Sequence, residues 1–436
     1  MSIDKAPFAR RREALLAALG EGVAVLPAAP VFIRNNDVEH HYRQDSDFWY
    51  LTGFDEPESV LVLSRKDGKD RSTLFVRERD PERETWDGPR AGVEGAVEHY
   101  GVDEAFPIQE LHARLPNYFV GANRLFCRIG RGHPFDATLF KSLNAARSKT
   151  RRSGDATPTE IVDLGVALHE LRIRKTDEEV SAMAAAAAIT CAAHRRAMEF
   201  ARPGMHEYEV EAEILRTFHK NGAPRVAYES IVGSGPNATI LHYRSNRRQI
   251  EDGDLLLIDA GCELGYYASD VTRTFPVGTR FTAPQRSLYE IVLQSQEACI
   301  DAVKPGVTLD DLHDIAVNVI TEGLVKVGLI EGSVEDAIKN EAYKAFYMHR
   351  TSHWIGMDVH DVGSYFAEGA PRPMEAGFVL TVEPGIYVSQ SADVEDKWKG
   401  IGIRIEDDIL VTGSGHRNLT SDVPKSVAEV EALTAG

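Results

Sequence analysis

The chain has 436 residues, of which 43% are hydrophobic and 27% charged, so its composition is that of a soluble globular protein with two or three domains. Its 67 Asp and Glu residues outnumber its 49 Lys and Arg residues and give a formal net charge of -18. This charge argues against nucleic acid or an anionic membrane as the main partner, because both repel acidic surfaces.

The first part of the chain alternates helical and strand patterns, which is typical of an α/β domain. A helix is predicted over residues 8–19, and its apolar part is too short for a signal peptide or a membrane span. The four cysteines form no CxxC pair, which favours a reducing, cytoplasmic location. Short apolar runs bounded by turn residues predict strands over residues 23–26, 59–63, 73–76 and 125–129.

A polar stretch over residues 149–158 marks the end of this domain, and we place the boundary between an N-terminal domain, 1–174, and a second domain, 175–436. Thr176 then begins a helix, because Glu179 three residues later completes a capping box. The helix ends at Pro203-Gly204, and a second helix is predicted over residues 208–220.

The second domain contains an internal repeat. Arg202-Pro203-Gly204 lies between two predicted helices, and Lys304-Pro305-Gly306 likewise follows one predicted helix and precedes another, over residues 309–327. Residues 251–261 align without a gap on residues 375–385, and both segments read as a polar turn, an apolar strand, an acid and a glycine. Such turn-strand-turn patterns also arise by chance. Because the acid and both glycines match together, we favour a domain of two related halves.

Each half places two acids near strand ends. Asp259 ends a strongly apolar strand, and a second predicted strand, 266–275, contains Asp270. In an antiparallel hairpin the two carboxylates would lie side by side and repel each other, so a cation between them is the natural remedy. The alternative is a pair of strand-end acids facing solvent.

The second half repeats this arrangement. Glu383 is the counterpart of Asp259, and Glu406 lies on a predicted strand over residues 400–410 as Asp270 lies on the first. Two halves facing each other would bring four carboxylates together. A pair of divalent cations would neutralise that charge best.

Histidines accompany these acids. His349 and His353 have the spacing of ligands on a helix face, but a zincin needs Glu after the first His, and Arg350 stands there. His360 follows in the sequence, and His242 comes after a turn-rich segment that is not a GxSxG nucleophile elbow. A single His is more often structural than catalytic, so these histidines alone change the expectation only modestly.

Taken together, these segments resemble aminopeptidase P, the Xaa-Pro aminopeptidase of the pita-bread metallopeptidases. The resemblance covers essentially the whole chain and includes the N-terminal segment 42–54 (YRQDSDFWYLTGF). The motifs that carry it are residues 259–261 (DAG), 269–275 (SDVTRTF), 352–356 (SHWIG), 358–361 (DVHD), 381–385 (TVEPG) and 402–407 (GIRIED). Arg350 departs from it, because bacterial relatives commonly carry Gly there.

The resemblance implies an α+β pita-bread catalytic domain with a curved sheet and two pseudo-symmetric halves. It also implies a homo-oligomer, often a dimer or tetramer. Two divalent metal ions, usually Mn²⁺, would be bridged by Asp270 and Glu406. Asp259 would bind one metal ion, and His353 and Glu383 the other.

The chemistry implied is hydrolysis of the bond between an N-terminal residue and a following proline, by a hydroxide that bridges the metals. Glu383 would take the proton of the water, and His360 and His242 would stabilise the tetrahedral oxyanion. Arg404 would position a ligand carboxylate, although an Arg on a strand is more often part of a surface ion pair. Asp37 is expected to orient His360.

Two other functions compete. A prolidase shares these ligands but cleaves only dipeptides, and sequence separates the two poorly. A metal-free pita-bread binding module or a creatinase-like enzyme would lack the ligands, whereas all five are present here.

Overall fold

The apolar runs of the first part of the chain form one mixed sheet, in the strand order β6-β5-β4-β1-β7-β8. Strand β4 is antiparallel to β1, and β5 is antiparallel to β4. The other pairs are parallel: β6 with β5, β7 with β1, and β8 with β7. The strands are β1 (Gly22–Pro27), β4 (Val60–Lys66), β5 (Lys69–Val76), β6 (Glu104–Pro107), β7 (Arg124–Cys127) and β8 (Glu160–Asp163). The predicted strand over residues 125–129 is thus two residues too long at its C-terminal end.

Helices surround this sheet, and α5 and α6 bury Leu115, Phe119 and Leu143 against its strands. A small hairpin of β2 (Ile33–Asn35) and β3 (Val38–Glu39) stands apart from the sheet. The helices are α1 (Ala6–Leu19), α2 (Ser46–Thr52), α3 (Pro81–Asp87), α4 (Gly92–Tyr100), α5 (Leu111–Phe119), α6 (Asp136–Thr150) and α7 (Gly165–Ile173). This confirms an N-terminal α/β domain.

The computed structural model describes residues 4–278 and 280–434. The chain divides into two compact units, Met1–Leu171 and Arg172–Gly436, a division that falls within α7, close to the boundary proposed from the sequence. Among the described residues no helix is both long enough and apolar enough to cross a membrane.

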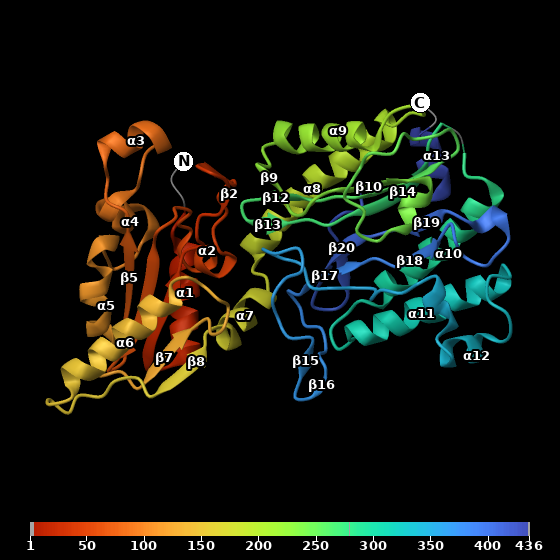
Figure 1. The fold of residues 1–436 in the computed structure, drawn as a ribbon. Coiled ribbons are helices and arrows are strands. Elements are labelled where there is room, and N and C mark those ends of the chain that lie inside the picture. Colours follow the sequence, from red (N-terminus) through yellow and green to blue (C-terminus); the bar gives the residue numbers. More distant parts are fainter. Residues whose placement is uncertain (1–3, 279, 435–436) are drawn as a thin grey trace. The chain divides into compact units, whose positions relative to one another are not determined.

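The second unit contains the two predicted helix pairs. The pairs are α8 (Asp177–Phe200) with α9 (Glu207–Lys220), and α10 (Ala283–Ala302) with α11 (Leu309–Lys326). The capping box predicted at Thr176 is present, since its hydroxyl accepts from the Glu179 N–H while the Glu179 carboxylate accepts from the Thr176 N–H. Figure 1 shows the strands of this unit between the two helix pairs.

Each half of this unit contains an antiparallel hairpin that is broken in the middle. In the first half β11 (Leu255–Asp259) pairs with β14 (Thr272–Pro276), and β12 (Cys262–Leu264) pairs with β13 (Tyr267–Ala268). In the second, β17 (Val379–Val382) pairs with β20 (Asp407–Val411), and β18 (Gly385–Val388) pairs with β19 (Ile401–Arg404). β11 and β17 begin at positions that the sequence alignment makes equivalent, which confirms two related halves.

The breaks correct the sequence prediction. The expected strands 266–275 and 400–410 are each interrupted, and Asp270 and Glu406 lie in the gaps rather than on a strand. At the first gap the Asp270 N–H donates to the Asp408 side chain, and at the second the Glu406 N–H donates to the Thr272 carbonyl of the other hairpin. The gaps contain strand-forming residues, Val271 and Ile405, beside the acids, so residue type alone did not reveal them.

Close approach of the backbone explains the glycine after Asp259. A Cβ atom on Gly261 would lie 1.7 Å from the carbonyl oxygen of Ser269, so only glycine fits between the two arms of the hairpin. In the other half Pro384 lies between β17 and β18, where its missing N–H suits a break in the ladder. The turn sequences therefore place the acids beside the breaks.

The remaining elements complete the second unit. Its core is one large cluster that includes Phe378, Trp354 and Tyr289. The other strands and helices of this unit are β9 (Arg225–Val226), β10 (Ile231–Ser234), β15 (Phe366–Ala367), β16 (Ala370–Pro371), β21 (His416–Asn418), α12 (Val334–Lys339) and α13 (Val427–Thr434). Its short 3-10 helices are η2 (Gly235–Thr239), η3 (Ala342–Ala345) and η4 (Asp396–Trp398), and the first unit contains η1 (Ile108–Glu110).

Candidate metal centre

The breaks of both hairpins open onto one cavity of about 880 Å³ within the second unit. Apolar side chains such as Ile231, Leu241 and Phe366 form part of its lining. All eight candidate site residues of the second unit also line it: Asp259, Asp270, Glu383, Glu406, His242, His353, His360 and Arg404. Acids far apart in the sequence are therefore brought to one place.

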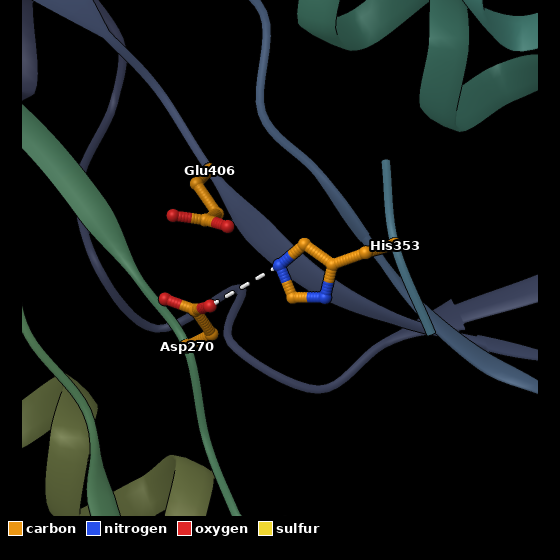
Figure 2. A group of neighbouring side chains, drawn as sticks. All are labelled: Asp270, His353 and Glu406. Carbon is orange, nitrogen blue, oxygen red and sulfur yellow. Dashed lines mark ion pairs between the residues drawn. The ribbon is translucent and has the colours of Figure 1, made fainter. Parts of the chain in front are cut away.

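Three of these side chains form a tight group (Figure 2). Ligand atoms of Asp270, His353 and Glu406 all lie within 4.8 Å of one another. The His353 Nε2 atom is 3.5 Å from Asp270 Oδ2 and 3.5 Å from Glu383 Oε1. The His353 Nδ1 atom is 3.0 Å from the Trp354 carbonyl, which can only accept, so Nδ1 carries the proton and Nε2 faces the acids.

The four-residue spacing of His349 and His353 is typical of a helix face, but neither histidine lies on a helix. Both lie in an irregular segment. The backbone of His353 is fixed by Thr381, whose N–H donates to the His353 carbonyl at 3.0 Å and whose hydroxyl accepts from the His353 N–H at 3.2 Å. His353 is thus held by β17, next to Glu383. This geometry is incompatible with a zincin site.

Arg404 is buried beside the acids rather than in a surface ion pair. Its Nη2 atom donates to Asp259 Oδ2 at 2.6 Å, its Nη1 atom to the Tyr387 hydroxyl at 2.9 Å, and its Nε atom to Thr272 Oγ1 at 3.1 Å. The Thr272 hydroxyl in turn donates to Glu406 at 2.6 Å. Arg404 therefore contacts one candidate ligand directly and another through one hydroxyl.

The sequence did not predict that Tyr228, Tyr387 and His349 lie next to the candidate ligands. The Tyr228 hydroxyl contacts the carboxylates of both Asp259, at 2.5 Å, and Asp270. The Tyr387 hydroxyl lies 2.9 Å from His349 Nε2, and His349 Nδ1 is 4.0 Å from Glu383. Tyr228 lies in an irregular segment without a motif, so no pattern in the sequence pointed to it.

A buried ion pair holds the backbone next to the candidate acids. Arg273 and Asp407 are both fully buried and 2.7 Å apart. The Arg273 Nη1 atom donates to the backbone carbonyls of Thr272, at 2.9 Å, and Glu406, at 2.6 Å, and thereby joins the two hairpins at their breaks. A buried guanidinium needs such a partner and such acceptors, because an unpaired charge would cost several kcal/mol (roughly 3–5).

The electrostatics of the group call for added positive charge. Burial raises the pKa of Glu406 well above its usual value and that of Glu383 to about 7, and it also raises the pKa of Asp259 despite Arg404. Burial opposes the shift at Asp270, but the hydrogen bond and charge of His353 lower its pKa. The pKa of His353 rises to about 9, since Asp270 and Glu383 outweigh its burial.

The residues present fit a divalent metal centre. Four carboxylates and one imidazole nitrogen converge; Asp270 and Glu406 are buried and the other two acids are partly buried. Two basic groups, His353 and Arg404, do not balance the four acids. Oxygen-rich sites with one His suit hard or borderline divalent cations, which would hold all four acids ionised. The geometry thus supports the ligand set expected from the sequence.

The remaining candidates lie around this group. The His360 ring is 4.4 Å from that of His353, and burial together with His353 lowers the pKa of His360, so it is neutral at pH 7. His242 is exposed to the cavity from a turn after η2. Arg350 pairs with Asp310 where both line the cavity. Asp37 lies in the β2–β3 turn of the first unit, and its link to His360 stays a prediction.

Comparisons with known proteins agree with this geometry. Residues 181–413 match Metallopeptidase family M24, and residues 8–126 match Aminopeptidase P, N-terminal domain. The Xaa-Pro aminopeptidase of Escherichia coli is 44% identical over 99% of this chain and 98% of its own length. Pseudomonas aeruginosa aminopeptidase PepP, whose structure is solved, is 52% identical to this chain in sequence. The two structures superpose with a TM-score of 0.97 over 100% of this chain and 99% of that one. A zinc-substituted E. coli aminopeptidase P with bound product is 43% identical, with a TM-score of 0.97, over 100% of this chain and 99% of that one.

Proposed function

This chain belongs to metallopeptidase family M24 and has the fold and the N-terminal domain of aminopeptidase P, and we propose that it is a metal-dependent Xaa-Pro aminopeptidase. The observation that carries the proposal is the convergence of Asp259, Asp270, Glu383 and Glu406 with His353 on one cavity. Full-length similarity to Xaa-Pro aminopeptidases favours this reaction over that of a prolidase.

We propose that these five residues hold two divalent metal ions. Asp270 and Glu406 are assigned to both ions, Asp259 to one, and His353 with Glu383 to the other. The short distances from His353 Nε2 to Asp270 and Glu383 support this division. Mn²⁺ is the proposed metal, because a site with four carboxylates and one imidazole suits a cation of its hardness.

Bound metal would supply Lewis acidity that makes water nucleophilic at neutral pH and polarises the carbonyl before proline. Glu383, which the bound cations would keep ionised, is placed to accept the proton of the attacking water. His242 and His360 line the same cavity as hydrogen-bond donors for the developing oxyanion. Arg404 holds Asp259 in place through its 2.6 Å ion pair. The proline preference itself has a physical basis, since an Xaa-Pro bond has no N–H to grip.

Peptide length provides the first test. We expect the protein to cleave an Xaa-Pro-Yaa tripeptide at a rate at least comparable with an Xaa-Pro dipeptide of the same first residue. Turnover of both would be measured by chromatography of the released amino acid in the presence of Mn²⁺, with an Xaa-Ala-Yaa tripeptide as the control for proline dependence. Cleavage of dipeptides alone would assign the protein as a prolidase.

A homo-oligomer is the second proposal. Large apolar side chains are exposed on the first unit: Trp86 is 82% exposed on α3, and Phe32 and Ile33 are more than half exposed near the β2–β3 hairpin. Exposed aromatic residues at this level are typical of an interface. We expect sedimentation velocity to show a dimer or tetramer, and Trp86→Glu to shift it toward monomer. Tyr208→Glu, at a partly exposed site on α9, is the control; a monomeric unsubstituted protein would contradict this.

The cytoplasm is the proposed location. All four cysteines are free and buried, and burial raises the pKa of each thiol to about 11 or 12. Free thiols that form no disulfide fit a reducing compartment.

A further inference from the structure

Among the buried acids outside the metal group, one is not used by the proposed chemistry and accepts several hydrogen bonds from a single segment of the chain. Glu207, the first residue of α9, is fully buried. Its carboxylate accepts five hydrogen bonds from Ser234, the last residue of β10, and from the segment that joins β10 to β11. A buried carboxylate with this many donors is costly to disturb, since removing it would leave several donors unpaired.

The two oxygens of Glu207 hold opposite ends of that segment. Oε1 accepts from the N–H and hydroxyl of Ser234, at 2.7 and 2.8 Å, and from the Asn237 amide at 3.1 Å. Oε2 accepts from the Tyr243 hydroxyl at 2.8 Å and from the Arg248 N–H at 2.9 Å. The Arg248 guanidinium also donates to Ser234 Oγ at 2.8 Å. Glu207 thus fixes the loop where it leaves β10 and where it returns.

His242 lies between these anchors. It is exposed to the cavity, whereas its neighbours Leu241 and Tyr243 pack against a small core cluster of Ile231, Ala238, Leu257 and Tyr387. The Tyr243 backbone N–H also donates to the Ile240 carbonyl at 3.3 Å. Since Tyr243 follows His242 directly, the bond from the Tyr243 hydroxyl to Glu207 fixes the backbone beside His242.

We propose that Glu207 is a positioning residue for His242, acting through the Tyr243 hydroxyl and the Ser234–Asn237 turn. The inference rests on the proposed role of His242 at the oxyanion. A donor stabilises a transition state only when its place is set beforehand, because a loop that must order during the reaction loses that advantage. Glu207 provides this order from outside the cavity.

The test is a double-mutant cycle on Tyr243 and His242. Tyr243→Phe removes only the hydroxyl, and we expect kcat for an Xaa-Pro-Yaa tripeptide to fall about ten-fold with bound metal unchanged. His242→Ala is expected to lower kcat by about a hundred-fold. In the His242→Ala background, Tyr243→Phe should have almost no further effect, because the residue through which it acts is gone.

The outcomes separate the two levels of the proposal. If the two losses multiply, Tyr243 does not act through His242 and the positioning role is wrong, while the proposed function stands. If His242→Ala leaves kcat unchanged, the role of His242 fails and the inference fails with it. A loss of bound metal in Tyr243→Phe, measured by atomic emission, would also count against positioning of His242.

A second pair of variants tests Glu207 itself. Glu207→Gln turns an NH₂ group toward hydrogen-bond donors, and we expect a larger fall in kcat than in Tyr243→Phe. Glu213→Gln is the matched control on the same helix, because Glu213 pairs with Arg196 and Arg216 away from the cavity. Equal losses in both variants would overturn the proposal. If Glu207→Gln does not fold, the Tyr243 cycle alone decides.

Discussion

Replacement of Asp270 by asparagine is expected to abolish turnover while the fold remains intact. Asp270 is the only candidate ligand among the described residues that contacts both His353 and Tyr228. Asparagine has the same shape and keeps the backbone N–H that donates to Asp408, but it loses the charge and one acceptor oxygen. Loss of a direct ligand should exceed the roughly 10–100-fold cost of losing an outer partner of a metal site.

Three measurements check this expectation. Turnover of an Xaa-Pro-Yaa tripeptide should fall more than about a hundred-fold. Bound metal, measured by atomic emission, should decrease, and circular dichroism should be unchanged. Asp301→Asn, at an exposed acid on α10, is the matched control and should retain both activity and metal. Near-normal rates in Asp270→Asn would remove Asp270 from the site.

Local patterns predicted the duplicated architecture and singled out the four acids, whereas the full set of candidate ligands came from the resemblance to aminopeptidase P. Asp259 and Glu383 follow apolar strands directly, and the gap-free alignment of residues 251–261 with 375–385 predicted that their strands are equivalent. Burying an acid at the end of such a strand is costly without a partner, so the residue types were consistent with a bound cation but also with acids facing solvent. The capping box at Thr176 could also be predicted, since its signature lies within four consecutive residues.

Contacts between distant segments could not be predicted in the same way. The Arg404–Asp259 ion pair joins the two halves, and nothing near Arg404 distinguishes it from an Arg in a surface pair. Tyr228 lies in an irregular segment, and the breaks at Asp270 and Glu406 interrupt segments that the sequence predicted as continuous strands. These features depend on which backbone groups find partners across the hairpins, which a one-dimensional pattern does not contain.

The structure also explains why Asp270 and Glu406 lie at breaks rather than on regular strands. Side chains of a regular strand alternate between the faces of the sheet, so acids on neighbouring strands would be held at fixed spacings. At a break the backbone is free of the ladder, and Arg273 can gather the Thr272 and Glu406 carbonyls on one guanidinium. The same side chain thereby holds the backbone of Glu406 next to Thr272, two residues after Asp270, and so helps to keep the two acids close together.

Removal of the metal ions is expected to abolish activity and to lower the unfolding temperature of the second unit. Without a cation, burial raises the pKa values of Glu406, Glu383 and Asp259, so the native state must keep protonated or repelling acids in one cavity. A metal that binds only the folded state stabilises it by about 2.7 kcal/mol at a free concentration of one hundred times its Kd.

The experiment is dialysis against a chelator, followed by activity, metal analysis and scanning calorimetry. Adding back Mn²⁺ should restore both activity and the higher unfolding temperature, and comparison with Zn²⁺ and Mg²⁺ would test the proposed identity of the metal. The Asp270→Asn variant is the internal control, because chelation should change its unfolding temperature much less. Activity that survives when metal analysis finds no bound ion would contradict the metal centre, since Glu383 and the histidines alone offer no means of activating water at neutral pH to the extent that two cations do.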